Sequence, residues 1–188
     1  MLTYEELRRR TTVVTYLEMH TRPAATRPRP GRAFRITALD RPSPRFYRYM
    51  YDAVGRDWGW VSRAQIDDAA LGEILDHPAT ELHLLTEGGV PAGYGELDRR
   101  QPGTVKVAYF GLLPEVLGRG LGRWFLEQIV GRAWRSPAGS PPVRRVWVHT
   151  CDLDHPRALA NYEAAGFHAY DRRTEPAWPA ELGSSDAA

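Results

Sequence analysis

A glycine-rich stretch is the first feature of the sequence that could carry chemistry. The segment LLPEVLGRGLG spans residues 112–122, and its glycines alternate with arginines and a leucine: Gly118, Arg119, Gly120, Leu121, Gly122 and Arg123. Glycines let a backbone approach an anion closely, and the unpaired N–H groups of a following helix attract negative charge. The spacing matches neither a GxxxxGK[ST] loop nor a GxGxxG fingerprint. On the glycines alone, a phosphate-binding loop of another kind and an ordinary strand-to-helix turn both stay open.

Other side chains could move protons. In GYGELD, Tyr94, Glu96 and Asp98 share one face of a predicted strand, so Glu96 is a candidate general base, with a solvated carboxylate as the alternative. His149 is the second candidate because imidazoles titrate near neutral pH. Cys151 would act as a nucleophile only beside a base that makes its thiolate, and a small buried thiol is the favoured interpretation. The six histidines lack ligand spacing, so no metal site is predicted.

Periodicity and turn residues predict the elements that must position these groups. Strands are predicted over residues 11–19, 32–40, 80–98 (a hairpin with Gly88 and Gly89 in its turn), 104–113, 144–150 and 167–173. Helices are predicted over residues 43–55, 62–78, 121–134 and 155–165. Ser43 and Pro44 are typical of a helix start, and Gly166 is typical of a helix end.

This order predicts an α/β (α+β) fold. We expect one domain over residues 1–173, with a mixed and largely antiparallel central sheet flanked by helices. The extra N-terminal strand, residues 11–19, would complete either its own sheet or that of a partner. Residues 20–32 form a loop rich in Pro and Arg, and residues 174–188 are expected to be a frayed polar tail.

Composition excludes several classes of protein. The chain has 188 residues and a net charge of only +2, which argues against a nucleic-acid binder. No apolar run approaches the ~18 residues of a membrane helix, and the N-terminus lacks the apolar region of a secretory signal. A single cysteine excludes an internal disulfide. We therefore expect a cytoplasmic protein without a membrane or nucleic-acid partner; a homodimer stays open.

Two segments together resemble the acetyl-CoA signature of the GNAT N-acetyltransferase superfamily. YFGLLPEVLGRGLGRWFLEQIV contains Gly120 and Gly122 where that family has [QR]-x-x-G-x-[GA], although Leu117 replaces the Gln or Arg. About 40 residues downstream, HPRALANYEAAGF resembles N-x-x-A-x-x-x-Y-E-x-x-G-F, with His155 in place of Asn. The resemblance covers residues 80–170 and implies an acetyl-CoA co-substrate.

The resemblance also implies roles for particular residues. The acetyl-CoA site would comprise Leu112, Leu113, Leu117, Gly118, Arg119, Gly120, Leu121, Gly122, Arg123, His155 and Tyr162. The backbone N–H of Leu112 or Leu113 would stabilise the oxyanion beside a strand bulge, for which Gly111 is suited. Tyr162 would protonate the departing sulfur, and Glu96 would take the proton of the amine through water.

The acceptor pocket is expected at the first two helices. Aromatic side chains there could wall a pocket for an apolar or cationic amine, or simply pack under the sheet. With His149, the candidate substrate-binding residues are Tyr47, Tyr51, Trp58 and Trp60. The sequence thus predicts an acetyl-CoA-dependent N-acetyltransferase that acts directly on a primary amine of a small molecule or peptide. The alternatives are an acyltransferase that uses another acyl-CoA and a non-catalytic acyl-CoA-binding protein.

Overall fold

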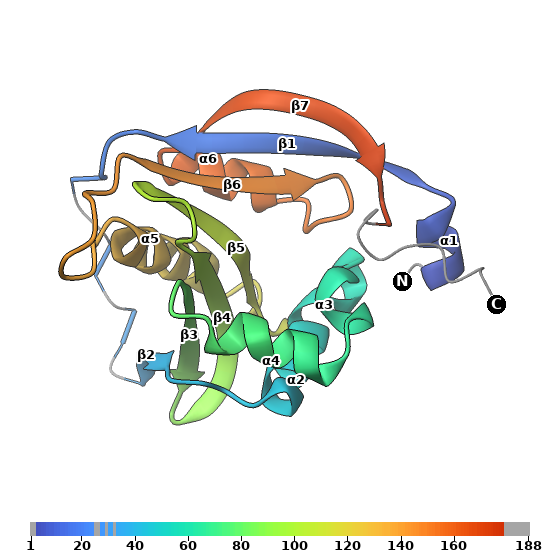
Figure 1. Cartoon of the computed structure of the whole chain (residues 1–188), viewed down its shortest axis with the longest axis horizontal. Helices are drawn as coiled ribbons and strands as arrows, with labels where there is room; N and C mark the ends of the chain where they lie inside the picture. The colour runs from blue at the N-terminus through green and yellow to red at the C-terminus, as the bar shows by residue number, and fades with distance from the viewer. Residues whose placement is uncertain (1–2, 25–26, 29, 32, 179–188) are drawn as a thin grey trace.

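A single mixed sheet organises the chain. The computed structural model describes residues 3–24, 27–28, 30–31 and 33–178. In these residues seven strands form one sheet in the order β2-β3-β4-β5-β6-β1-β7 (Figure 1). The strands are β1 (Thr11–Met19), β2 (Phe34–Leu39), β3 (Thr80–Glu87), β4 (Val90–Asp98), β5 (Thr104–Leu112), β6 (Arg145–Cys151) and β7 (His168–Pro176). All neighbours are antiparallel except β5 and β6, which confirms the predicted mixed and largely antiparallel sheet.

Helices cover the two faces of this sheet and divide the core in two. They are α1 (Tyr4–Arg8), α2 (Pro44–Gly55), α3 (Ser62–Gln65), α4 (Asp68–Asp76), α5 (Leu121–Ala133) and α6 (Ala158–Ala164), with 3₁₀ turns η1 (Arg56–Trp58) and η2 (Pro114–Val116). α5 and α6 bury one face, whereas α2 and α4 bury the other (Figure 1). None of the helices in the described ranges combines the length and apolar character needed to cross a membrane.

Local capping explains where several helices begin. The Ser43 side chain accepts the N–H of Phe46 at the start of α2, as the sequence predicts. The single helix expected over residues 62–78 is wrong, because Ile66 is extended and Asp67 caps a new helix, α4. The helix expected from His155 begins three residues later, as α6.

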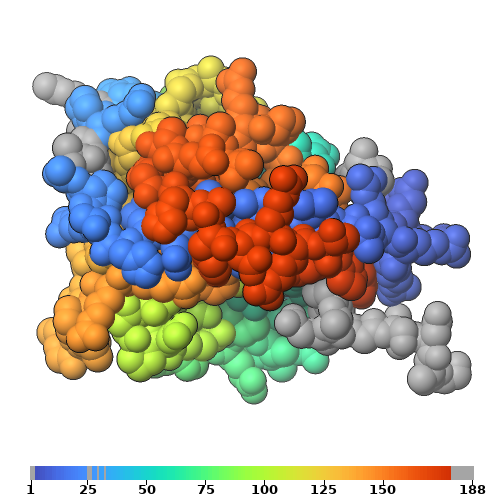
Figure 2. Space-filling view, turned by 90° about the horizontal axis from the view of Figure 1, so that it is seen from above, coloured from blue at the N-terminus to red at the C-terminus, as the bar shows by residue number. Residues whose placement is uncertain are grey.

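The N-terminal strand completes the chain's own sheet. β1 lies between β6 and β7, so the first and last parts of the chain run side by side (Figures 1 and 2). α1, which the sequence analysis does not predict, begins with a capping box between Thr3 and Glu6.

The last strand is longer than the predicted range of residues 167–173 at its C-terminal end. β7 continues to Pro176, and Trp178 is buried against Leu7 and Val61. Residues 179–188 of the expected tail lie outside the described residues.

Part of the Pro- and Arg-rich loop contacts the domain. Both the backbone N–H of Arg27 and its guanidinium bind the Glu127 carboxylate on α5. Residues 25, 26, 29 and 32 of this predicted loop lie outside the described residues, and the following strand is described from Phe34.

A bulge in β5 turns its side chains from one face to the other. Leu97 pairs with Val107 and Glu96 pairs with Tyr109, so Ala108 is the extra residue. The bulge therefore lies at Ala108 and not at Gly111. Gly111 has another role: a Cβ atom there would lie 2.3 Å from Cγ1 of Val54, so glycine lets α2 approach β5.

We predict that Gly111→Ala lowers the free energy of unfolding by about 1–3 kcal/mol, because the added methyl group overpacks the contact with Val54. Urea unfolding would measure the loss. Gly72→Ala is the matched control, since a Cβ there meets only Pro44 at 4.0 Å and alanine favours the helix. Combining Gly111→Ala with Val54→Ala should cost less than the sum of the two single changes. An additive double variant would contradict the proposed clash.

Candidate active site

A cleft opens where β5 and β6 separate. Their parallel pairing covers Thr104–Lys106 against Arg145–Trp147 and then stops, although both strands continue. A cavity of about 420 Å³ lies along the separated halves and reaches the glycine-rich loop. Strands that part in this way leave backbone N–H and C=O groups without a ladder partner, so the cleft offers hydrogen bonds to a ligand.

The glycine-rich loop supplies one end of the cavity. Gly118 and Gly120 have φ values of 76° and 75°, a left-handed conformation that strongly favours glycine. Gly120 caps α5, and no side chain satisfies the first N–H groups of this 13-residue helix. An added Cβ at Gly118 or Gly120 would meet no atom within 4 Å. Open space before an uncapped helix N-terminus suits an anion.

The two arginines of the loop point to different partners. Arg123 lines the cavity, where its Nε donates to Glu127 at 2.7 Å and another N–H donates to the carbonyl of Ala164. Arg119 is paired with Glu87 at 2.5 Å and does not line the cavity. Leu117, Leu121 and the remaining loop glycines line it.

Only one of the two expected oxyanion donors faces the gap. The N–H of Leu113 donates to the carbonyl of Ala92 on β4 at 2.9 Å. Because successive N–H groups of an antiparallel strand point to opposite edges, the N–H of Leu112 points toward the side that β6 has left. Leu112 lines the cavity, and Leu113 does not.

Tyr162 of α6 lies in the wall of the cavity and is only 8% exposed. Its burial, and then the nearby Asp154 carboxylate, raise the pKa of its phenol. The group therefore remains a protonated donor at neutral pH.

Asp154 is a residue that the sequence analysis missed. Its carboxylate accepts the Thr150 hydroxyl at 2.7 Å, the N–H of Cys151 at 3.0 Å and the indole N–H of Trp60 at 3.2 Å. These bonds join the end of β6 to the loop after α2. The only signal in the sequence is an aspartate just after a strand, which is too common to single out.

A second contact closes the same end of the cleft. The rings of Trp58 and His155 meet edge to face with centroids 5.0 Å apart. Nδ1 of His155 accepts the N–H of Arg157, which leaves Nε2 as the donor of the neutral ring. Trp58, Trp60 and Tyr51 all line the cavity.

Two other residues expected at the site lie behind the cavity wall. Glu96 is 1% exposed, and its oxygens accept the Tyr47 hydroxyl at 2.5 Å and the Arg63 guanidinium at 2.8 Å. Tyr47 is 0% exposed, so its ring packs in the core away from the cavity. Neither Glu96 nor Tyr47 lines the cavity, whereas Tyr109, the residue of β5 that pairs with Glu96, does. The sequence pattern predicts that Glu96 shares a strand face with Tyr94, but it does not predict that α2 and α3 cover this face.

His149 and Cys151 share a strand face and both line the cavity. Although part of His149 is exposed, the surrounding walls, and then the Lys106 ammonium, lower its pKa to about 4. The imidazole is therefore neutral at pH 7. Burial, and then Asp154, raise the pKa of the Cys151 thiol, which disfavours a thiolate nucleophile.

Comparison with known proteins adds independent observations. The model of the acetyltransferase (GNAT) family matches residues 38–167. No curated protein sequence matches the chain.

Solved structures share the fold. A GNAT-family putative acetyltransferase from Novosphingobium aromaticivorans is 20% identical with a TM-score of 0.57, and the match covers 88% of this chain and 63% of that one. A GCN5-related N-acetyltransferase from Sphaerobacter thermophilus is 20% identical with a TM-score of 0.54, covering 90% and 53%. A tandem GNAT protein from the clavulanic acid biosynthesis pathway is 17% identical with a TM-score of 0.57, covering 90% and 55%. The chain thus spans less than two thirds of the length of these proteins.

We predict that Glu96→Gln lowers the free energy of unfolding by about 3–5 kcal/mol, because it leaves the guanidinium of Arg63 buried without its counter-charge. Chemical denaturation would measure this change. Asp52→Asn removes an exposed ion pair with Arg56 and should cost less than about 1 kcal/mol. Near-equal stability of the Glu96→Gln variant and the native chain would show that the ion pair is not a structural element.

Proposed function

The chain belongs to the acetyltransferase (GNAT) family, and we propose that it transfers an acetyl group from acetyl-CoA directly to a primary amine of a small molecule or peptide. One observation carries the proposal: the separated strands β5 and β6 form a cavity that joins an uncapped helix N-terminus to the Leu112 N–H and Tyr162. An anion site, a carbonyl-binding N–H and an acid on one cavity are what acyl transfer from a phosphorylated thioester requires.

The glycine-rich loop would hold the coenzyme A pyrophosphate. The left-handed Gly118 and Gly120 leave open space before α5, so N–H groups of the first turn can approach the phosphate oxygens. Arg123, which lies at the cavity edge and is bound to Glu127 through Nε, would offer guanidinium N–H groups to the phosphate and so compensate for Leu117, which has no side-chain donor. His155, at the position of the family's Asn, can donate from Nε2.

The residues of this chain divide the chemistry among them. Acetyl-CoA supplies a thioester carbonyl that the neutral amine attacks, and its sulfur leaves as a thiolate. The N–H of Leu112 would donate to the carbonyl oxygen as negative charge develops there. Tyr162 would give its proton to the departing sulfur, and a base takes one proton from the attacking amine.

His149 supports the role of base better than Glu96. It lies on the cavity as a neutral imidazole, whereas both oxygens of Glu96 are engaged behind the wall. With its low pKa, His149 would be a weak base that is available throughout the neutral range. Glu96 would then act by holding Arg63 under the ring of Tyr109, 5.4 Å from its centroid.

The acceptor would enter between the loop after α2 and the end of β6. Trp58, Trp60 and Tyr109 offer ring faces there, which suit an apolar or cationic amine, whereas Tyr51, only 2% exposed, packs in the core beneath them. Among the described residues that line the cavity, Asp154 is the one with a carboxylate, and this carboxylate already accepts three hydrogen bonds.

Cofactor binding is tested by thermal unfolding with acetyl-CoA, with adenosine diphosphate and NAD as controls. At ligand about 100 times its Kd, the stabilisation of roughly 2.7 kcal/mol should raise Tm by about 5–10 °C. Arg123→Ala should weaken binding about tenfold, because a hydrogen bond to a charged group is lost. Arg119→Ala is the matched control and should change Kd less than about threefold. Equal losses of acetyl-CoA affinity in both variants would show that Arg123 and Arg119 do not differ in cofactor binding. If acetyl-CoA does not raise the Tm of the native chain, acetyl-CoA is not the ligand of this cavity.

Tyr162→Phe should lower kcat by about 10²–10³-fold while leaving the Kd for acetyl-CoA nearly unchanged, because it deletes only the proton donor. Because the pKa of Tyr162 is raised, the donor stays protonated through the neutral range, so the loss should be the same at pH 6 and pH 8. Steady-state kinetics with a panel of amines measures kcat, and Tyr170→Phe on exposed β7 is the control. Unchanged turnover would exclude Tyr162 as the acid, and a native chain that binds acetyl-CoA but acetylates no amine would favour a non-catalytic binder.

A further inference from the structure

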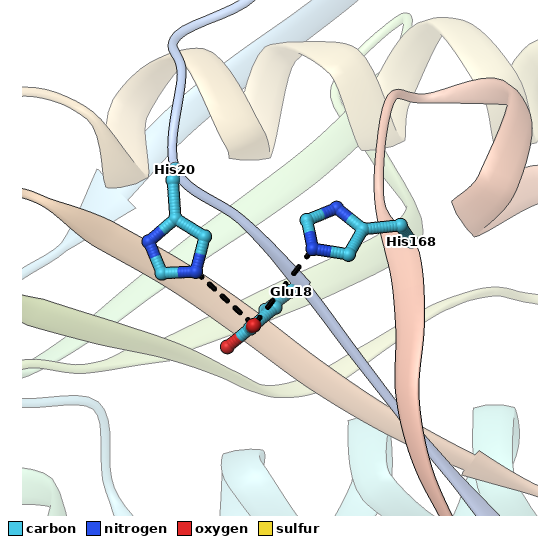
Figure 3. A group of neighbouring side chains, drawn as sticks. All are labelled: Glu18, His20 and His168. Carbon is cyan, nitrogen blue, oxygen red and sulfur yellow. Dashed lines mark ion pairs between the residues drawn. The ribbon is translucent and has the colours of Figure 1, made fainter.

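The outer face of β1 and β7 brings three potential metal ligands together. Glu18 of β1 lies directly opposite His168 of β7. His20 follows Glu18 by two residues, and its side chain turns to the same carboxylate (Figure 3). Nε2 of His20 lies 3.1 Å and Nε2 of His168 lies 3.8 Å from Oε1 of Glu18. The three donor atoms all lie within 4.8 Å of one another, the one such group found in the described part of the chain.

These donors suit a divalent transition metal. Imidazole nitrogen and carboxylate oxygen bind Zn²⁺ at about 2.0–2.2 Å, so ligand atoms around one ion lie about 3–3.5 Å apart. The observed separations need only small side-chain rotations, and both imidazoles are more than half exposed, at 55% and 59%, so they are free to make them. Solvent on the same side can fill the remaining coordination positions.

The carboxylate is also held in place by a neighbour. Nε of Arg145 donates to Oε2 of Glu18 at 2.6 Å, which leaves Oε1 turned toward the two imidazoles (Figure 3). Hydrogen bonds of this kind orient metal ligands in proteins. The guanidinium also brings a positive charge near the site, which lowers the affinity for a cation, so we expect a modest Kd.

We propose that Glu18, His20 and His168 form a binding site for one divalent transition-metal ion such as Zn²⁺. The site lies outside residues 38–167, so it does not depend on the proposed acetyl transfer. It joins the two strands that the family model leaves out. Because β7 is an edge strand that pairs with β1 alone among the described strands, the ion would fasten this edge to the sheet.

The sequence gives no sign of this site. His20 and His168 lie 148 residues apart, and the prediction of no metal site rests on histidine spacing along the chain. Only the antiparallel register of β1 and β7 makes them neighbours.

Calorimetric titration of the 188-residue chain without a histidine tag tests the proposal, with Zn²⁺ and Co²⁺ as probes and Mg²⁺ as the control ion. We expect one Zn²⁺ per chain, little response to Mg²⁺, and a higher Tm with Zn²⁺, because the ligands meet only in the folded state. The absorption spectrum of the Co²⁺ form should lack a thiolate charge-transfer band, which excludes Cys151 as a ligand.

His20→Ala, His168→Ala and Glu18→Gln should each weaken Zn²⁺ binding by at least ~10-fold. His77→Ala, at the exposed end of α4, is the matched control and should bind as the native chain does. Unfolding of each variant without metal separates loss of the site from loss of the fold. If a variant fails to fold, imidazole ¹H–¹⁵N resonances of the native chain identify which histidines respond to Zn²⁺.

Two results would overturn the proposal. Absence of stoichiometric Zn²⁺ and Co²⁺ binding at micromolar ion would leave only a hydrogen-bonded cluster. Unaltered binding in the His20→Ala/His168→Ala double variant, or a response confined to other histidines, would place the ion elsewhere.

Discussion

The short parallel pairing of β5 with β6 is the constraint on which the rest of the structure depends. Three residues of each strand are joined, and the two strands then part while β5 continues to Leu112. This separation leaves the N–H of Leu112 directed at the gap and lets the cavity reach the start of α5. The bulge at Ala108 lies where the pairing has just ended, and it rotates Tyr109 and Gly111 toward α2. The cavity wall at Tyr109 and the orientation of the Leu112 N–H thus arise from one local irregularity.

β6 loses its pairing with β5 beyond Trp147, but it keeps a neighbour because β1 pairs with its other edge. β6 pairs with β1 over six residues, from Val146–Met19 to Cys151–Val14, a length that includes the part beyond Trp147 where β5 has departed. β1 in turn carries β7 on its other edge. The N-terminal strand therefore covers the other edge of β6, so the cleft can stay open without leaving β6 as a free edge. The family match does not include this strand, because it begins at residue 38, within β2.

The sequence predicts local features well and long-range contacts poorly. The alternation in TTVVTYLEM predicts β1 with its correct bounds, and Ser43 with Pro44 predicts the start of α2, because these signals depend on neighbouring residues. The break at Ile66 was missed, since the residues on both sides favour a helix and only the cap at Asp67 divides them. The strand face of Glu96 was predicted, but its burial depends on Tyr47 and Arg63 from two separate helices. For the same reason, the partners of Asp154 and the neighbours of His20 could not be inferred from spacing.

Close contacts at two glycines set the width of the cleft on the side of α2. A Cβ at Gly111 would lie 2.3 Å from Val54, and a Cβ at Gly55 would lie 2.3 Å from the indole of Trp60. The end of α2 therefore rests on the sheet, and Trp60 folds back over the helix with its N–H directed at Asp154. Since Asp154 also binds the end of β6, the spacing between the helix and the sheet determines how far the two walls of the cleft stand apart. Glycine at these positions is thus a requirement of the cleft as much as of the core, because any side chain would displace Val54 or Trp60 and with them the cavity wall.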